Sequence, residues 1–100
     1  MDWSAPYRAD VEACCQTAWR LGREVDAQRL PAALEQTCRA LQRWILLPVH
    51  LPENRQRLLT LLARLEQLCL RVAQAAKQPA ILVTLCTQMH HVILELQHYL

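Results

Sequence analysis

The sequence contains a single glycine and no phenylalanine in 100 residues, and these scarcities exclude several classes of protein. A phosphate-binding loop needs several glycines close together, so one glycine excludes it. No segment has the alternating, β-branched pattern of a strand, which argues against a sheet-based fold. No Ser–His–Asp order occurs in a strand–turn–helix context. We therefore expect a helical protein without enzymatic activity.

Signals for export, membrane insertion and lipidation are also absent from the sequence. Residues 1–10 begin with an acid and have no apolar run, unlike a signal peptide. Uninterrupted apolar stretches are far shorter than the about 20 residues that a membrane span needs. The five cysteines are an odd number in a chain without an export signal, which favours free thiols in a reducing compartment. We therefore expect a cytoplasmic protein.

Charge of one sign is scarce as well, because 11 basic residues are offset by 9 acidic ones and the net charge is +2. Acids and arginines cancel in residues 1–50, so the excess lies in residues 51–100. This excess is too small to indicate polyanion binding by itself. The arginines are spread over several predicted helices, and no nucleic-acid-binding motif accompanies them. Nucleic-acid association is therefore the third of three functional hypotheses.

Leucine at helical spacing is what the sequence has in abundance. The segment 57–76 contains no glycine or proline, and its apolar residues recur at steps of three and four. This stripe is Leu58, Leu61, Leu65, Leu68, Val72 and Ala75, with Leu62, Cys69 and Ala76 beside it and with Leu59 and Leu70 further round. So broad an apolar face predicts a helix, from about 52 to 77, that contacts more than one neighbour.

Three further stripes predict helices at 5–27, from 31 to just before Pro48, and at 79–100. They consist of Tyr7, Val11, Cys14, Ala18, Leu21 and Val25; of Leu30, Leu34, Cys38, Leu41 and Ile45; and of Leu82, Leu85, Met89, Val92, Leu96 and Tyr99. Short joints connect the helices, which favours antiparallel neighbours. The chain 1–100 is therefore predicted to be one all-α domain, a four-helix up-down-up-down bundle. The alternative is a pair of long hairpins that complete their core by dimerising.

Cysteine and histidine raise the question of a metal site on the last helix. Cys86 and His90 are spaced i, i+4, and His91, Glu95 and His98 are spaced i, i+4, i+7. No CxxC pair and no second helix of carboxylate and histidine ligands accompany them. We therefore expect no metal and no cofactor. The stripes also predict that Cys14 and Cys38 are buried and that Cys15, which lies off its stripe, is the most accessible thiol.

Arg57, Arg64 and Arg71 repeat every seven residues and so stack along one flank of the third helix, about 10 Å apart. No acid of that helix shares the flank. Such an arginine strip either keeps the bundle soluble or docks an acidic protein surface. A second candidate contact is apolar: Val83 and Leu94 fall outside the main stripe of the last helix, with His90 between them. Together with Leu59 and Leu70, these residues would suit a homodimer or partner contact.

The order of several features resembles the cyanobacterial PatD family. Trp44-Ile45 stands shortly before Pro48, residues 55–59 read RQRLL, residues 75–79 read AAKQP, and Tyr99 lies near the end. The likeness covers roughly residues 25 to 99. PatD-like proteins are small cytoplasmic proteins associated with control of heterocyst frequency and with assembly of the tubulin-like division protein FtsZ. The resemblance implies the same class of activity for this chain and carries over no functional residues.

The primary functional hypothesis is therefore a non-enzymatic regulator that binds another protein, with FtsZ as the candidate partner. The second hypothesis is a structural bundle whose partner is itself or an obligate co-subunit. The residues expected at the partner contact are Arg57, Arg64, Arg71, Val83, His90 and Leu94.

The odd cysteine count predicts that the native protein contains no intramolecular disulfide. Neighbouring Cys14 and Cys15 point about 100° apart on a helix, so they cannot readily bridge each other. Titration with a thiol reagent after denaturation without reductant should find all five thiols free. Fewer than five, in protein kept from air, would contradict both the prediction and the expected reducing compartment.

Overall fold

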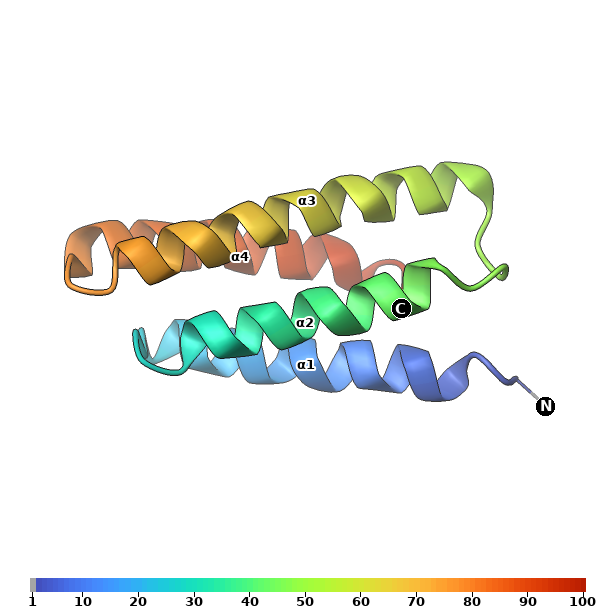
Figure 1. Cartoon of the computed structure of the whole chain (residues 1–100), viewed down its shortest axis with the longest axis horizontal. Helices are drawn as coiled ribbons and strands as arrows, with labels where there is room; N and C mark the ends of the chain where they lie inside the picture. The colour runs from blue at the N-terminus through green and yellow to red at the C-terminus, as the bar shows by residue number, and fades with distance from the viewer. Residues whose placement is uncertain (1) are drawn as a thin grey trace.

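The computed structural model describes residues 2–100, and its four helices run antiparallel to their neighbours along the chain (Figure 1). These helices are α1 (Ala5–Arg23), α2 (Leu30–Ile45), α3 (Pro52–Gln74) and α4 (Pro79–Gln97). No strand occurs in the described residues. The helix α4 returns beside α1, whereas α1 and α3 lie diagonally across the bundle. The predicted all-α, up-down-up-down bundle is confirmed, and its two hairpins close one core within a single chain.

A proline lies in the first turn of each helix. Pro6, Pro31, Pro52 and Pro79 all lie in a first helical turn. There the amide hydrogen that proline lacks would have no partner in the helix, and its fixed φ angle suits the helical backbone. The prolines therefore set the four helix starts that the sequence predicts.

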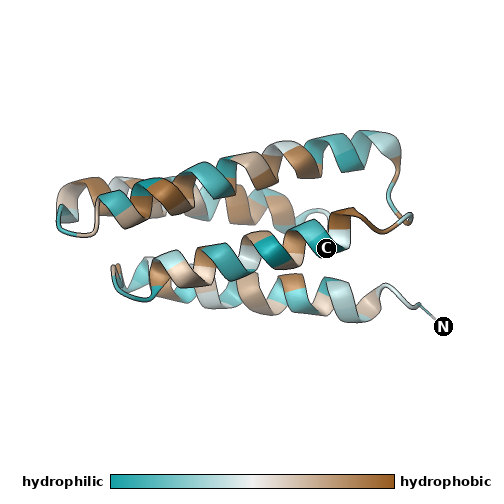
Figure 2. Ribbon diagram, viewed as in Figure 1, coloured by the Kyte–Doolittle hydropathy of each residue, from teal (hydrophilic) through white to brown (hydrophobic). Residues whose placement is uncertain are grey.

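The core is one cluster of apolar side chains supplied by all four helices. Its fully buried members include Leu34 and Leu41 from α2, Leu61 and Leu65 from α3, and Ile93 from α4. Hydrophobic and hydrophilic residues alternate along the helices with the turn period, as Figure 2 shows for α3. Each fully buried leucine stabilises the fold by about 2 kcal/mol. The predicted stripes of α2 and α3 are buried throughout, as is that of α4 except for its half-buried last residue, Tyr99.

The stripe predicted for α1 is only partly right. Val11, Ala18 and Leu21 are buried, but Tyr7 is exposed, and Cys14 and Val25 are half-buried. Two other residues complete the buried face in their place, namely Cys15 and Gly22. The reason is that α1 packs against both α2 and α4, so its buried face is rotated towards α4. The prediction that Cys15 is the most accessible thiol is therefore wrong.

Three helices end earlier than predicted. The helix α1 ends at Arg23 rather than at residue 27, because Val25 adopts a left-handed backbone conformation with φ of 52°. The Asp26 amide then donates to the Leu21 carbonyl at 3.0 Å, which satisfies a carbonyl at the helix end. The helices α3 and α4 end at Gln74 and Gln97, three residues before the predicted ends.

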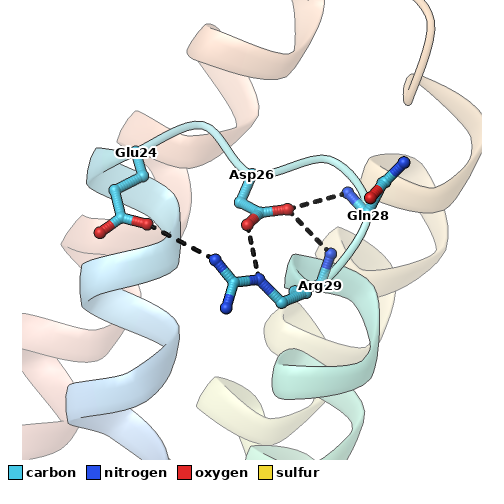
Figure 3. A network of polar contacts seen from close by, with 4 residues as sticks. All are labelled: Glu24, Asp26, Gln28 and Arg29. Carbon is cyan, nitrogen blue, oxygen red and sulfur yellow. Dashed lines mark hydrogen bonds and ion pairs between the residues drawn. The ribbon is translucent and has the colours of Figure 1, made fainter.

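Asp26 organises the turn between α1 and α2 (Figure 3). Its carboxylate accepts hydrogen bonds from the backbone amides of Gln28 at 3.2 Å and Arg29 at 3.1 Å. The Arg29 side chain also donates to Asp26, at 2.7 Å, and lies 4.0 Å from Glu24. These bonds cap the turn that leads into α2, in the manner of an N-cap aspartate. The Arg29 bonds, followed by that of Gln28, hold the pKa of Asp26 below its usual value.

By length and composition α4 is apolar enough to cross a membrane, which is weak evidence because core helices of bundles share this property. In this structure many of the apolar side chains of α4 are buried in the core of the bundle. Leu82, Leu85, Met89, Val92 and Leu96 are all buried against the other helices.

Replacing Leu65 with aspartate should severely destabilise the bundle, because the side chain is fully buried and a carboxylate there has no partner. The matched control is Leu70→Asp on the same helix, where the side chain is 65% exposed. We expect thermal melting to show a fall of more than about 10 °C for Leu65→Asp and of only about 2 °C for the control. Similar melting temperatures for both variants would contradict the assigned core face.

Replacing Asp26 with alanine should lower the melting temperature at neutral pH, because the turn loses its capping carboxylate. The folded-state pKa of Asp26 lies below the unfolded value, so this stabilisation is present above about pH 4 and is lost as the pH falls through the folded pKa. The difference in melting temperature between parent and variant should therefore shrink on acidification. The control Glu35→Ala, which removes an exposed ion pair with Arg39 and no backbone bond, should show little difference at any pH. A pH-independent difference for Asp26→Ala would show that its charge does not stabilise the turn.

Candidate functional site

The three arginines of the strip lie on the flank of α3 that faces α4. Arg64 and Arg71 are exposed, whereas Arg57 is half-buried. Helix geometry spaces them about 10 Å apart. The structure therefore places Arg57, Arg64 and Arg71 along one side of one helix, as their spacing predicts, and adds a second wall to that side, which is α4.

Arg57 differs from the other two arginines because it has an acidic partner. Its guanidinium donates to the carboxylate of Glu95 on α4, and both side chains are about one-third exposed. The expectation of an arginine strip without acidic partners is therefore wrong for Arg57, because its partner lies on another helix. A residue 38 positions away can be recognised as a neighbour only after the packing of α4 is known.

Arg64 and Arg71 line an open groove between α3 and α4. The groove consists of two adjoining hollows of about 330 and 640 Å³, which share Arg71 and Gln88. Amide and other polar side chains from both walls also line it, and these are Gln67, Gln74, Gln78, Thr84 and His91. Its floor is apolar, formed by Leu68 and Val92 in one hollow and by Ala75 and Leu85 in the other.

Both groove arginines lack a carboxylate partner. Within residues 2–100, neither Arg64 nor Arg71 forms an ion pair. Glu95 is held by Arg57, and Glu66 lies on the α2 side of α3, where its charge acts on Cys38. The α3–α4 groove therefore presents two guanidinium groups whose charge is not neutralised by the protein. Each retains its planar set of donors for a carboxylate or another anion.

The candidates for a partner contact on α4 differ in how far their side chains are exposed. Val83 and Leu94 are 51% and 48% exposed. Between them His90 is half-buried, because its ring stacks on Trp19 of α1 with ring centroids 4.3 Å apart. The His90 Nε2–H donates to the Trp19 backbone carbonyl at 3.2 Å. His90 is thus engaged within the bundle, while Val83 and Leu94 are about half exposed on the same helix.

Gly22 lies in the contact between α1 and α4, against the ends of the Met89 and His90 side chains. A Cβ atom at this position would lie 2.3 Å from the terminal methyl of Met89 and 2.9 Å from His90 Nε2. The single glycine of the chain therefore makes room for the α1–α4 contact. That contact closes the bundle and places α4 as the second wall of the groove.

A larger apolar exposure lies at the opposite end of the bundle, in the connection between α2 and α3. Leu46, Val49 and Leu51 are 82%, 47% and 63% exposed. The connection also contains His50, whose ring packs edge-on against Trp44 with the ring centroids 4.5 Å apart. From the sequence, this segment was predicted only to connect two helices. The density of apolar residues around Pro48 could have indicated that it also exposes an apolar surface.

The cysteines show no sign of an activated thiol. Burial raises the pKa of Cys15 and of Cys38 to about 12, and it raises the pKa of Cys14, Cys69 and Cys86 as well. None of the five forms a disulfide. Within residues 2–100, no three cysteine, histidine or acidic side chains gather as metal ligands would.

The candidate site is therefore the α3–α4 groove with its two unpaired arginines. Its chemistry suits recognition of carboxylates by a shallow, polar surface. Comparison of the chain with known protein families, with curated proteins and with solved structures gave no match.

Proposed function

We propose that this protein is a non-enzymatic regulator that binds an acidic protein partner through the α3–α4 groove. The observation that carries the proposal is the pair of exposed guanidinium groups, Arg64 and Arg71, without a carboxylate partner in the described residues. An acidic partner would supply the missing carboxylates, and charge-assisted pairs of this kind steer association and fix its register.

Several features support a protein rather than a nucleic acid as the partner. The net charge is only +2, and outside the groove many arginines are paired, as in Arg43 with Asp10 and Arg39 with Glu35. Duplex DNA presents closely spaced phosphates and usually takes many basic contacts. Two arginines within an amide-lined groove match a protein segment with a few carboxylates better than they match the many phosphates of duplex DNA.

The tubulin-like division protein FtsZ is the partner that we propose to test first. The resemblance of residues 25 to 99 to the PatD family points to it, as does the generally acidic character of such filaments. The regulator would act in the cytoplasm by changing filament assembly, and in a cyanobacterium this would affect cell division or heterocyst formation.

A structural role as a homo-oligomer or co-subunit is the second candidate function. The exposed side chains of Leu46, Val49 and Leu51 favour it, because they are apolar and lie in one short connection. In that role the α2–α3 connection would form the contact, and the groove arginines would contribute little.

Replacing Arg64 and Arg71 together with glutamate should weaken and slow association with the acidic partner and reduce its dependence on salt. The measurement is co-sedimentation of purified FtsZ filaments with parent and variant at low and moderate salt. The variant should stay folded, since both side chains are exposed and such changes shift stability by about 0.5 kcal/mol each.

The matched control is Arg20→Glu with Arg23→Glu, which changes the net charge equally on α1, away from the groove. Equal loss of binding in both double variants would indicate a nonspecific charge effect. A folded groove variant that co-sediments as well as the parent would rule out the arginines as the contact.

If the parent itself fails to sediment with FtsZ, then FtsZ is not the partner. Retention of the chain by duplex DNA with steep salt dependence would favour the nucleic-acid hypothesis.

A further inference from the structure

We infer that the α3–α4 groove accepts an extended segment in the polyproline II conformation, with carboxylates at positions i and i+3. This inference rests on the proposed function and specifies the shape of the partner. It follows from the spacing of the groove arginines and from the amide side chains between them.

The spacing of Arg64 and Arg71 selects among backbone conformations. Seven residues of α3 place the two arginine positions about 10 Å apart on one side of the helix. In polyproline II, side chains at i and i+3 share a face and lie about 9 Å apart, which matches this distance. In a β-strand, side chains that share a face are separated by about 7 or about 13 Å, and both values lie further from the arginine spacing.

A partner helix would also match the spacing, with carboxylates at i and i+7. The groove, however, offers hydrogen-bonding groups that a helix backbone would not use, because a helix satisfies its own amides and carbonyls. A polyproline II segment has no internal hydrogen bonds, so its backbone groups need outside partners.

The glutamines of the groove can supply those partners. Gln67 and Gln74 lie on the α3 wall, Gln88 lies on the α4 wall, and Gln78 lies at the turn between the two helices. Each primary amide both donates and accepts, so it can bind a peptide N–H or a peptide carbonyl. Within residues 2–100, none of these four amide side chains forms a hydrogen bond. They remain available to a ligand.

The position of the groove also suits a chain that enters and leaves as an extended segment. Figure 1 shows that the α3–α4 turn reaches further than the α1–α2 turn at the same end of the bundle. The larger hollow lies beside that turn, lined by Gln78 and Ala80. An extended segment can therefore run along the groove and past this end without meeting α1 or α2.

The test uses short synthetic peptides and measures their binding to the full chain by amide chemical shifts in nuclear magnetic resonance. The main probe is a proline-containing peptide with glutamates at i and i+3. Three matched peptides accompany it: an isomer with adjacent glutamates, a copy with N-methylated backbone amides, and a cross-linked helix with glutamates at i and i+7. We expect the main probe to shift the groove amides and to bind about tenfold more tightly than each of the other three.

Protein variants show which side chains recognise the peptide. Arg64→Glu with Arg71→Glu should abolish binding of the main probe and should instead bind a peptide with lysines at i and i+3. Gln67→Met with Gln88→Met should weaken the main probe several-fold while leaving the N-methylated copy unchanged. The control Gln16→Met with Gln42→Met, two exposed glutamines outside the groove, should leave every affinity unchanged.

Each other outcome overturns the inference in a recognisable way. Tighter binding of the cross-linked helix would assign the groove to a helical partner. Equal affinity for the adjacent-glutamate isomer would mean that the arginine spacing does not select the ligand. If no peptide binds while FtsZ still binds through Arg64 and Arg71, then the groove recognises a folded surface, and the proposed function survives without the extended segment. If neither peptides nor FtsZ bind, the extended segment is ruled out and FtsZ is not the partner.

Discussion

Burial of the leucine face of α3 is the interaction on which the rest of the structure depends. Leu58, Leu61 and Leu65 are completely buried, and each contributes about 2 kcal/mol to folding. A face this broad cannot be covered by one neighbour, so α3 contacts both α2 and α4. Its orientation in the bundle is thereby fixed, and with it the direction in which its polar flank points. The arginine strip beside α4 is a consequence of how the leucines are buried.

The position of α4 in the bundle determines which arginines of the flank are paired with an acid and which are not. Gly22 leaves room for the Met89 and His90 side chains of α4, and the His90 ring packs against Trp19 of α1. With α4 in this position, Glu95 pairs with Arg57, while no acidic residue lines the groove opposite Arg64 and Arg71. The same packing therefore compensates one arginine and leaves two unpaired. An anion-binding groove arises without any large net charge on the molecule.

The fold was largely predictable because each helix contains a repeating apolar stripe and has a proline in its first turn. Where the prediction of buried residues failed, in α1, the apolar stripe was narrow. A narrow stripe leaves the rotation of a helix open by one residue position, and contact with α4 selected Cys15 in place of Cys14. The end of α1 was predicted too late, at residue 27. A left-handed residue at a helix end is usually glycine, but here it is Val25, so the sequence did not indicate the turn.

For the candidate site, heptad spacing alone was enough to place Arg57, Arg64 and Arg71 on one flank, because the helix period fixes which residues share a side. The sequence by itself also determined that the chain is all-helical and which faces of α2, α3 and α4 are buried. Only the tertiary structure decided that Arg57 is paired, that His90 is engaged with Trp19, and that glutamines from two helices line one groove. These facts depend on contacts between residues far apart in sequence. Such contacts are set by the packing of whole helices, and no local pattern encodes them.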